Sequence, residues 1–161
     1  MKNFVFISPN YPSNYWMFVR GLKKYGARVL CVIDTPYESL HEELKKNMDE
    51  CYKVSSFNNY DEVFKAVAYF SYKYGKIDWI ESNNEAWLML DARLRDDFHV
   101  TTGFTSARVE ELQSKSAMKK YYEQAGLATA PYCLPKSLDE CLEFAGRFVY
   151  FLVLKPDHGV G

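Results

Sequence analysis

The sequence carries a potential anion-binding segment close to its last residue. Seven apolar residues, 148–154, run directly into Lys155, and Pro156, Gly159 and Gly161 follow. A lysine at the end of a buried strand needs a partner, because an unpaired buried ammonium group is costly. Pro156 favours an extended conformation at Lys155, and the two glycines allow backbone amides to fold around an anion. These residue types in this order indicate a site for phosphate.

Lys115 is a second candidate for anion binding. It would occupy the first turn of a helix capped by Ser114. The free amides there carry about half a positive charge, so a cation is disfavoured by up to about 1 kcal/mol. The same amides and the lysine would together suit a phosphate. The alternative is a lysine surrounded by water, where the penalty is small, and both interpretations stay open.

Glu85 is a candidate because of its place in the predicted sheet. It begins the helix that follows the fourth predicted strand. Ligands of open parallel sheets bind beyond the carboxyl ends of the strands, where the strand order reverses. A carboxylate at a helix start also gains about 0.3–1 kcal/mol from the helix dipole without any ligand, so a structural role remains an alternative. The turn after the first strand lacks the G-x-G-x-x-G pattern of dinucleotide-binding proteins.

The first part of the chain alternates strands and helices. Compact apolar runs predict strands, and capping residues followed by helically spaced apolar residues predict helices. The predicted strands are 4–8, 28–34, 51–55 and 77–82; the helices begin at Ser13, about residue 39, Asn59 and Asn83 or Asn84. Four such units in series predict the α/β class, with a Rossmann-like parallel sheet that carries helices on both faces.

The pattern changes after residue 98. Residues 99–105 are predicted to form a short loop or an edge strand, and a brief helix ends near residue 112. A helix capped by Ser114 follows, ended by Gly126, and a Ser137-x-x-Glu140 capping box opens another that ends at Gly146. The apolar run 148–154 predicts a buried strand.

Composition limits the classes of partner. The chain has 161 residues, 48% apolar and 25% charged, with a net charge of -1, so no overall field attracts nucleic acid or an anionic membrane. The first apolar run is too short for a signal peptide or a membrane span, and we expect a cytoplasmic location. The four cysteines lack metal-binding or redox spacing and are interpreted as reduced thiols.

The order of these parts resembles the ATP-grasp superfamily, in particular the large subunit of carbamoyl phosphate synthase and related carboxylate-amine ligases. The resemblance rests on the parallel α/β domain, then "SKSAMKKYYEQAGLATAPY", then the apolar run, Lys-Pro and the glycines. It implies that residues 1–112 are a pre-ATP-grasp domain. Residues 113–161 would be the truncated α+β beginning of the ATP-grasp domain.

The resemblance also implies a site and a mechanism. Lys115, Lys155, Gly159 and Gly161 match the positions that contact the phosphates of ATP in this superfamily. The pre-ATP-grasp domain contributes to acceptor binding there, which makes Asn10, in "PNYPSN", and Glu85 the candidates for substrate binding. ATP, with Mg²⁺, would phosphorylate a small carboxylate to an acyl phosphate, and an amine would displace the phosphate.

The sequence departs from the superfamily because it ends within the glycine segment. The residues that hold magnesium are missing, so we expect these 161 residues alone to be catalytically inert. We expect the remainder of the ATP-grasp domain to be supplied in cis or in trans. A homodimer through an exposed strand edge, or through a swapped segment after about residue 113, is a further expectation.

A non-catalytic function is the alternative to the ligase hypothesis. The chain could be a nucleotide-binding or small-ligand-binding module on a Rossmann-like sheet, because this fold does not by itself specify a reaction. The two lysines distinguish the alternatives, since only the ligase hypothesis requires both of them to contact a triphosphate. The identities of the carboxylate and the amine are not encoded in any motif that we find.

Overall fold

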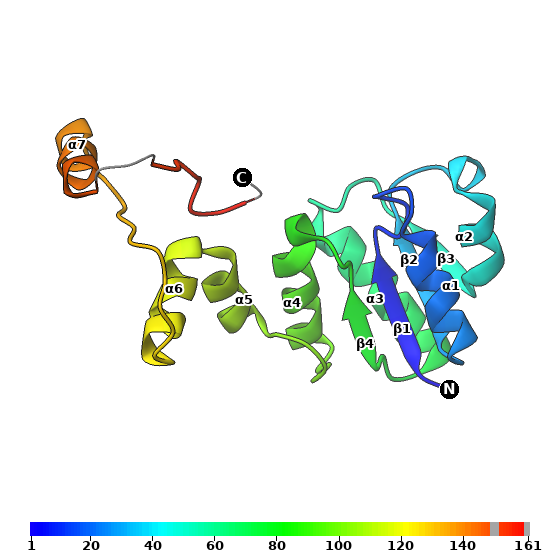
Figure 1. The fold of residues 1–161 in the computed structure, drawn as a ribbon. Coiled ribbons are helices and arrows are strands. Elements are labelled where there is room, and N and C mark those ends of the chain that lie inside the picture. The colour runs from blue at the N-terminus through cyan, green and yellow to red at the C-terminus, as the bar shows by residue number, and fades with distance from the viewer. Residues whose placement is uncertain (149–151, 160–161) are drawn as a thin grey trace. The chain divides into compact units, whose positions relative to one another are not determined.

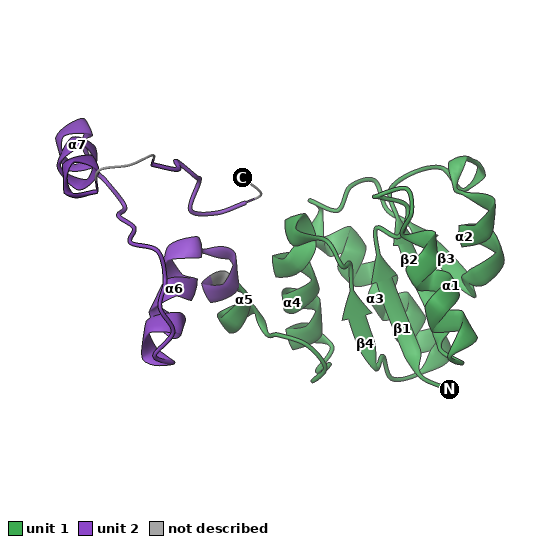
Figure 2. Cartoon of the chain, in the orientation of Figure 1, with its two compact units in different colours: residues 1–109 green, residues 110–161 purple. Residues whose placement is uncertain are grey.

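The computed structural model describes residues 1–148 and 152–159. The chain divides into two compact units, Met1–Val109 and Glu110–Gly161, which Figure 2 colours separately. The first contains the sheet, and the second contains the predicted phosphate-binding residues.

The first unit is built on a four-stranded parallel sheet with the strand order β3-β2-β1-β4 (Figure 1). The register places Val5 of the central strand beside Leu30 on one side and Ile80 on the other. All four predicted strands and the predicted fold class are confirmed. The strands are β1 (Asn3–Ile7), β2 (Arg28–Ile33), β3 (Glu50–Lys53) and β4 (Trp79–Glu81).

Two pairs of helices cover the two faces of the sheet. The core on one face contains Val19 of α1 (Trp16–Lys24) and Leu44 of α2 (Glu42–Asn47). The core on the other face contains Phe70 of α3 (Tyr60–Tyr74) and Leu94 of α4 (Leu88–Asp97). Alternate residues of β2 contribute to each core, which explains why its sequence is an unbroken apolar run. The expectation of helices on both faces is therefore confirmed.

The predicted helix boundaries in the first unit are confirmed for α3, but α2 begins at Glu42 and not near residue 39, and α4 begins at Leu88 and not directly after Asn83 or Asn84. α3 lies between the predicted Asn59 and Gly75, and the positive φ of 83° at Gly75 explains the glycine. The predicted cap at Ser13 is wrong, because α1 begins at Trp16 with Tyr15 as its cap residue. The segment before it forms a tight turn instead, in which the amide of Tyr15 donates to the carbonyl of Pro12 at 3.0 Å.

The second unit contains two capped helices and the end of a third. α5 (Ser106–Gln113) begins in the first unit, and α6 (Lys115–Gln124) and α7 (Leu138–Arg147) follow. Ser114 and Ser137 accept hydrogen bonds from the amides of Ala117 and Glu140, as the sequence predicts. The expected helix end at Gly146 is wrong by one residue, because α7 continues to Arg147.

The predicted buried strand at 148–154 is not formed by its described residues. Residues 149–151 lie outside the part of the chain that is described; Leu152, Val153 and Leu154 form no strand and are exposed. A strand needs a neighbour for its backbone hydrogen bonds, and residues 110–148 and 152–159 provide none. Across these residues and the first unit, no helix is both long and apolar enough to cross a membrane.

Candidate functional site

The first candidate region lies where the strand order reverses, between the carboxyl ends of β1 and β4. The loops after these strands are joined there, because the Tyr15 hydroxyl donates a hydrogen bond of 2.6 Å to the carbonyl of Asn83. Asn10 lies in the loop after β1, and its amide nitrogen is 3.4 Å from the Thr35 hydroxyl. Glu85 is exposed and begins the short helix η2 (Glu85–Trp87) after β4. Both predicted substrate-binding residues therefore lie in loops at this end of the sheet.

Asn10 has an unsatisfied polar atom in this region. Its side-chain oxygen is buried and has no hydrogen-bond partner among the residues that the structure describes. Buried amide oxygens are normally paired, so an orphan acceptor marks a place where a donor of a ligand or a water could bind. A separate open hollow of about 390 Å³, whose lining does not include Asn10, lies between α1 and the end of β4. Its lining is mostly apolar: Phe6, Met17, Phe18, Gly21, Leu22, Tyr25, Glu81 and Asn83.

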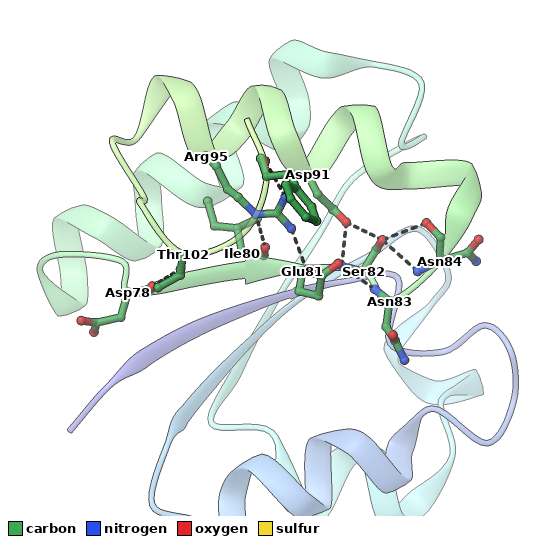
Figure 3. Close-up of polar contacts among 10 residues, drawn as sticks. Asp78, Ile80, Glu81, Ser82, Asn83, Asn84, Asp91, Arg95 and Thr102 are labelled. Carbon is green, nitrogen blue, oxygen red and sulfur yellow. Dashed lines mark hydrogen bonds and ion pairs between the residues drawn. The ribbon is translucent and has the colours of Figure 1, made fainter. Parts of the chain in front are cut away.

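Arg95 is the centre of a buried polar cluster at β4 (Figure 3). Its side chain is only 3% exposed, and its guanidinium group makes three hydrogen bonds. Nε donates to the carbonyl of Ile80 at 2.9 Å, Nη1 to the carbonyl of Phe104 at 2.9 Å, and Nη2 to the Glu81 carboxylate at 2.8 Å. Arg95 thus ties α4, β4 and the loop after α4 together.

Asp91 lies one turn before Arg95 on α4 and is fully buried. One carboxylate oxygen accepts hydrogen bonds from the amide and the hydroxyl of Ser82, at 2.9 and 2.6 Å. The other oxygen has no partner within the described chain. Burial raises the pKa of Asp91 to about 7, and the nearby charge of Glu81 adds to this effect. The carboxyl group therefore changes charge near neutral pH, and it contacts Ser82, which directly follows the strand that borders the switch point.

Sequence reasoning did not identify this cluster. Asp91 and Arg95 each follow an apolar position of α4, Leu90 and Leu94, and charged residues of a helix are usually in water. The one signal in the sequence is their spacing. Residues four apart lie on the same side of a helix, so the opposite charges of Asp91 and Arg95 can pair there. Because both lie directly beside the apolar stripe of α4, that side can face the core.

The second candidate region, in the second unit, brings two of the predicted phosphate-binding residues together. The ammonium group of Lys115, in the first turn of α6, donates a hydrogen bond of 2.6 Å to the carbonyl of Gly159, although the two residues are 44 positions apart. Gly159 has a positive φ of 89°, a conformation that favours glycine. Lys155 is exposed and makes no hydrogen bond or ion pair within the described residues. Gly161 lies outside them.

The amides at the start of α6 are already occupied. Lys115 and Ser116 donate their amides to the carbonyl and the carboxylate of Asp157, at 2.9 and 2.8 Å. Ala117 and Met118 donate to the side chain and the carbonyl of Ser114. A carboxylate of the chain itself therefore lies where we expected a phosphate to meet the helix. The lysine side chains, rather than these amides, remain as groups that could bind a phosphate.

The expected magnesium ion has no visible ligand set in the described part of the chain. Residues 1–148 and 152–159 contain no group of three histidine, cysteine, aspartate or glutamate side chains that could hold a metal ion. Mg²⁺ prefers oxygen ligands, and at nucleotide sites it is usually held by one or two carboxylates together with waters and phosphate oxygens. The described residues show no preformed cluster of such ligands, and no step of the proposed chemistry passes through the ion.

No model of a protein family matches the sequence, and no curated protein is significantly similar to it. Solved structures are similar in fold over nearly the whole chain. The biotin carboxylase domain of a 2-oxoglutarate carboxylase from Hydrogenobacter thermophilus, in complex with MgADP, ADP and bicarbonate, has a TM-score of 0.73 and 22% identity. The match covers 99% of this chain and 36% of that one.

Two further structures support the same conclusion about the fold. An L-amino acid ligase from Bacillus licheniformis has a TM-score of 0.67 and 15% identity, with 99% of this chain and 38% of that chain covered. N5-carboxyaminoimidazole ribonucleotide synthetase from Thermotoga maritima has a TM-score of 0.62 and 19% identity, over 89% and 36%. The chain spans little more than a third of these chains. The expected resemblance to the N-terminal part of ATP-grasp enzymes is confirmed at the level of fold.

Proposed function

We propose that this chain supplies part of the triphosphate-binding site of an ATP-dependent carboxylate-amine ligase. Lys115, Lys155 and the loop at Gly159 would hold the phosphates of ATP. The observation that carries this proposal is the contact between the ammonium group of Lys115 and the carbonyl of Gly159, which joins two segments that the sequence independently indicates as phosphate-binding. The fold shared with a domain that binds MgADP and bicarbonate and with an amino acid ligase supports it.

The two lysines would act by electrostatic stabilisation. A γ-phosphoryl group that moves to a carboxylate spreads negative charge over its oxygens, and fixed cations stabilise that charge. The product is an acyl phosphate, which an amine attacks with release of phosphate. Among the described residues, the ammonium group of Lys115 donates to a neutral carbonyl. A triphosphate would offer it a negatively charged acceptor, which adds Coulomb attraction to the hydrogen bond.

The loops at the switch point would bind the carboxylate or the amine. Asn10 contributes a buried oxygen that needs a donor, and an amine or ammonium group is such a donor. Glu85, exposed at the start of η2, would add a negative charge that favours a cationic substrate. The remainder of the enzyme would be supplied in cis or in trans, and the chain alone would be inert.

The proposal is tested by titrating the 161-residue chain with MgATP and measuring the dissociation constant by NMR, which detects weak binding. Lys115→Ala and Lys155→Ala are each expected to weaken binding about tenfold, because each removes a charge-assisted hydrogen bond. Lys120→Ala is the matched control, since Lys120 is an exposed lysine of the same helix α6. Equal affinities for all four proteins would contradict the proposal.

A ligand-binding module without chemistry remains the second candidate. The orphan oxygen of Asn10 and the apolar hollow between α1 and β4 favour it, because both could serve a small ligand without any phosphate. For such a module we expect a different result from the same variants. Lys115→Ala and Lys155→Ala would leave binding of the small ligand unchanged, and Asn10→Ala would weaken it.

A further inference from the structure

We infer that Asp157 is a positioning residue for the triphosphate: it fastens the segment 155–159, which we call the lysine-glycine loop, to the start of α6, and so sets the position of Lys115. The inference rests on the proposed function and deepens it. Asp157 would not touch the nucleotide. It would act through the geometry of the loop and of Lys115.

The contacts of Asp157 form a three-point attachment. Its backbone carbonyl accepts from the amide of Lys115 at 2.9 Å, and one carboxylate oxygen accepts from the amide of Ser116 at 2.8 Å. The other oxygen accepts from the hydroxyl of Ser114, which is largely buried, at 2.7 Å. Three consecutive residues of one segment thus hold one residue of another. The bond from Ser114 is the main cause that lowers the pKa of Asp157, so the carboxylate is charged at neutral pH.

A second contact lies two residues further along the loop. There the ammonium group of Lys115 reaches the carbonyl of Gly159. The loop is therefore held to α6 at two places, by the backbone and side chain of Asp157 and by the side chain of Lys115. A loop that is already ordered loses less entropy when a ligand binds, and this increases affinity.

If only its charge mattered, Asp157 would weaken the binding of a triphosphate. It places a negative charge beside a lysine that we expect to bind a polyanion, and like charges repel. If electrostatics dominated, removal of the charge would strengthen binding. If attachment of the loop dominates, removal of the hydrogen bonds weakens binding even though a repulsive charge is lost. The sign of the effect therefore separates the two roles.

Two substitutions separate attachment from charge. Asp157→Asn and Asp157→Ala remove the same charge, but asparagine keeps an oxygen that can accept from the amide of Ser116. We expect Asp157→Asn to bind inorganic tripolyphosphate about as tightly as the unchanged chain. Asp157→Ala should bind it about tenfold more weakly than Asp157→Asn, the equivalent of about one neutral hydrogen bond. Glu123→Gln, an exposed residue near the other end of α6, controls for loss of charge.

The measurement is an NMR titration of the full 161-residue chain, with circular dichroism to compare helix content. Weaker binding by the alanine variant than by the asparagine variant, at equal helix content, supports the inference. Equal binding by both variants, whether tighter or unchanged relative to the unsubstituted chain, overturns the inference and leaves the proposed function standing. If no protein, including the unsubstituted chain, binds tripolyphosphate, both the inference and the proposed function fail.

Discussion

The guanidinium group of Arg95 leaves no room for a side chain at Gly103. A Cβ atom at Gly103 would lie 2.9 Å from both Cζ and Nε of Arg95, and the φ of Gly103 is +94°. Arg95 cannot move away without cost, because three hydrogen bonds hold its buried side chain. The loop after α4 therefore depends on a glycine that covers the arginine.

Gly103→Ala is expected to destabilise the first unit by more than about 1 kcal/mol, through backbone strain and the close contact with Arg95. The free energy of unfolding in urea measures this effect. Gly21→Ala is the matched control, because Gly21 lies inside α1 and a Cβ atom there would have nothing within 4 Å. That change should stabilise the unit by about 0.5–1 kcal/mol. The same sign for both variants would contradict our description of the loop.

Arg95→Ala is expected to lower the free energy of unfolding by about 3–5 kcal/mol. The change leaves the Glu81 carboxylate without its buried partner and removes the donor to two backbone carbonyls. Arg93→Ala, two positions away on α4, should cost less than about 1 kcal/mol, because Arg93 is exposed and its described contact is with the ring of Tyr60. Urea unfolding of both variants checks the difference, and equal losses would refute the role of Arg95.

Asp91 is expected to make the stability of the first unit depend on pH. Its pKa in the folded protein is about 7, above the ordinary value of 3.8, so the folded protein holds the proton more tightly than the unfolded chain. Between about pH 4 and pH 7 the folded protein binds more protons, and its stability falls as pH rises. Asp91→Asn should remove this decline.

The measurement for Asp91 is the free energy of unfolding at several values of pH, for both proteins. The stability of Asp91→Asn relative to the unsubstituted chain should increase from pH 4 to pH 7 and then remain constant. Parallel curves over this interval would show that Asp91 is ionised in the folded protein, contrary to our interpretation of its buried, half-paired carboxyl group.

The sequence predicts the elements of the first unit because their signals are local. The run from Val29 to Ile33 is apolar on both faces and forms the buried part of strand β2. Asn59 and Gly75 delimit α3. The inner position of Asp91 and Arg95 could not be predicted, since their burial depends on partners in β4 and in the loop after α4. Helical spacing does not reveal such partners.

The second unit shows the same limit for contacts between distant segments. The lysines and glycines could be selected from the sequence, because their chemistry and order are distinctive. The place of Asp157 at the start of α6 could not: the resemblance implies that both segments meet at a phosphate, but nothing in the sequence gives residue 157 a bond to residues 114–116. Composition predicts a strand at 148–154, but strand formation requires a neighbouring strand that composition does not supply.

Mapping the MgATP site by NMR on the 161-residue chain tests the proposed phosphate site most directly. We expect the amide signals of Lys115, Lys155 and Gly159 to shift on addition of MgATP, while those of β1 do not. Shifts confined to the loops around Asn10 and Glu85, or no shifts at all, would contradict the claim that the two lysines and the lysine-glycine loop bind the triphosphate.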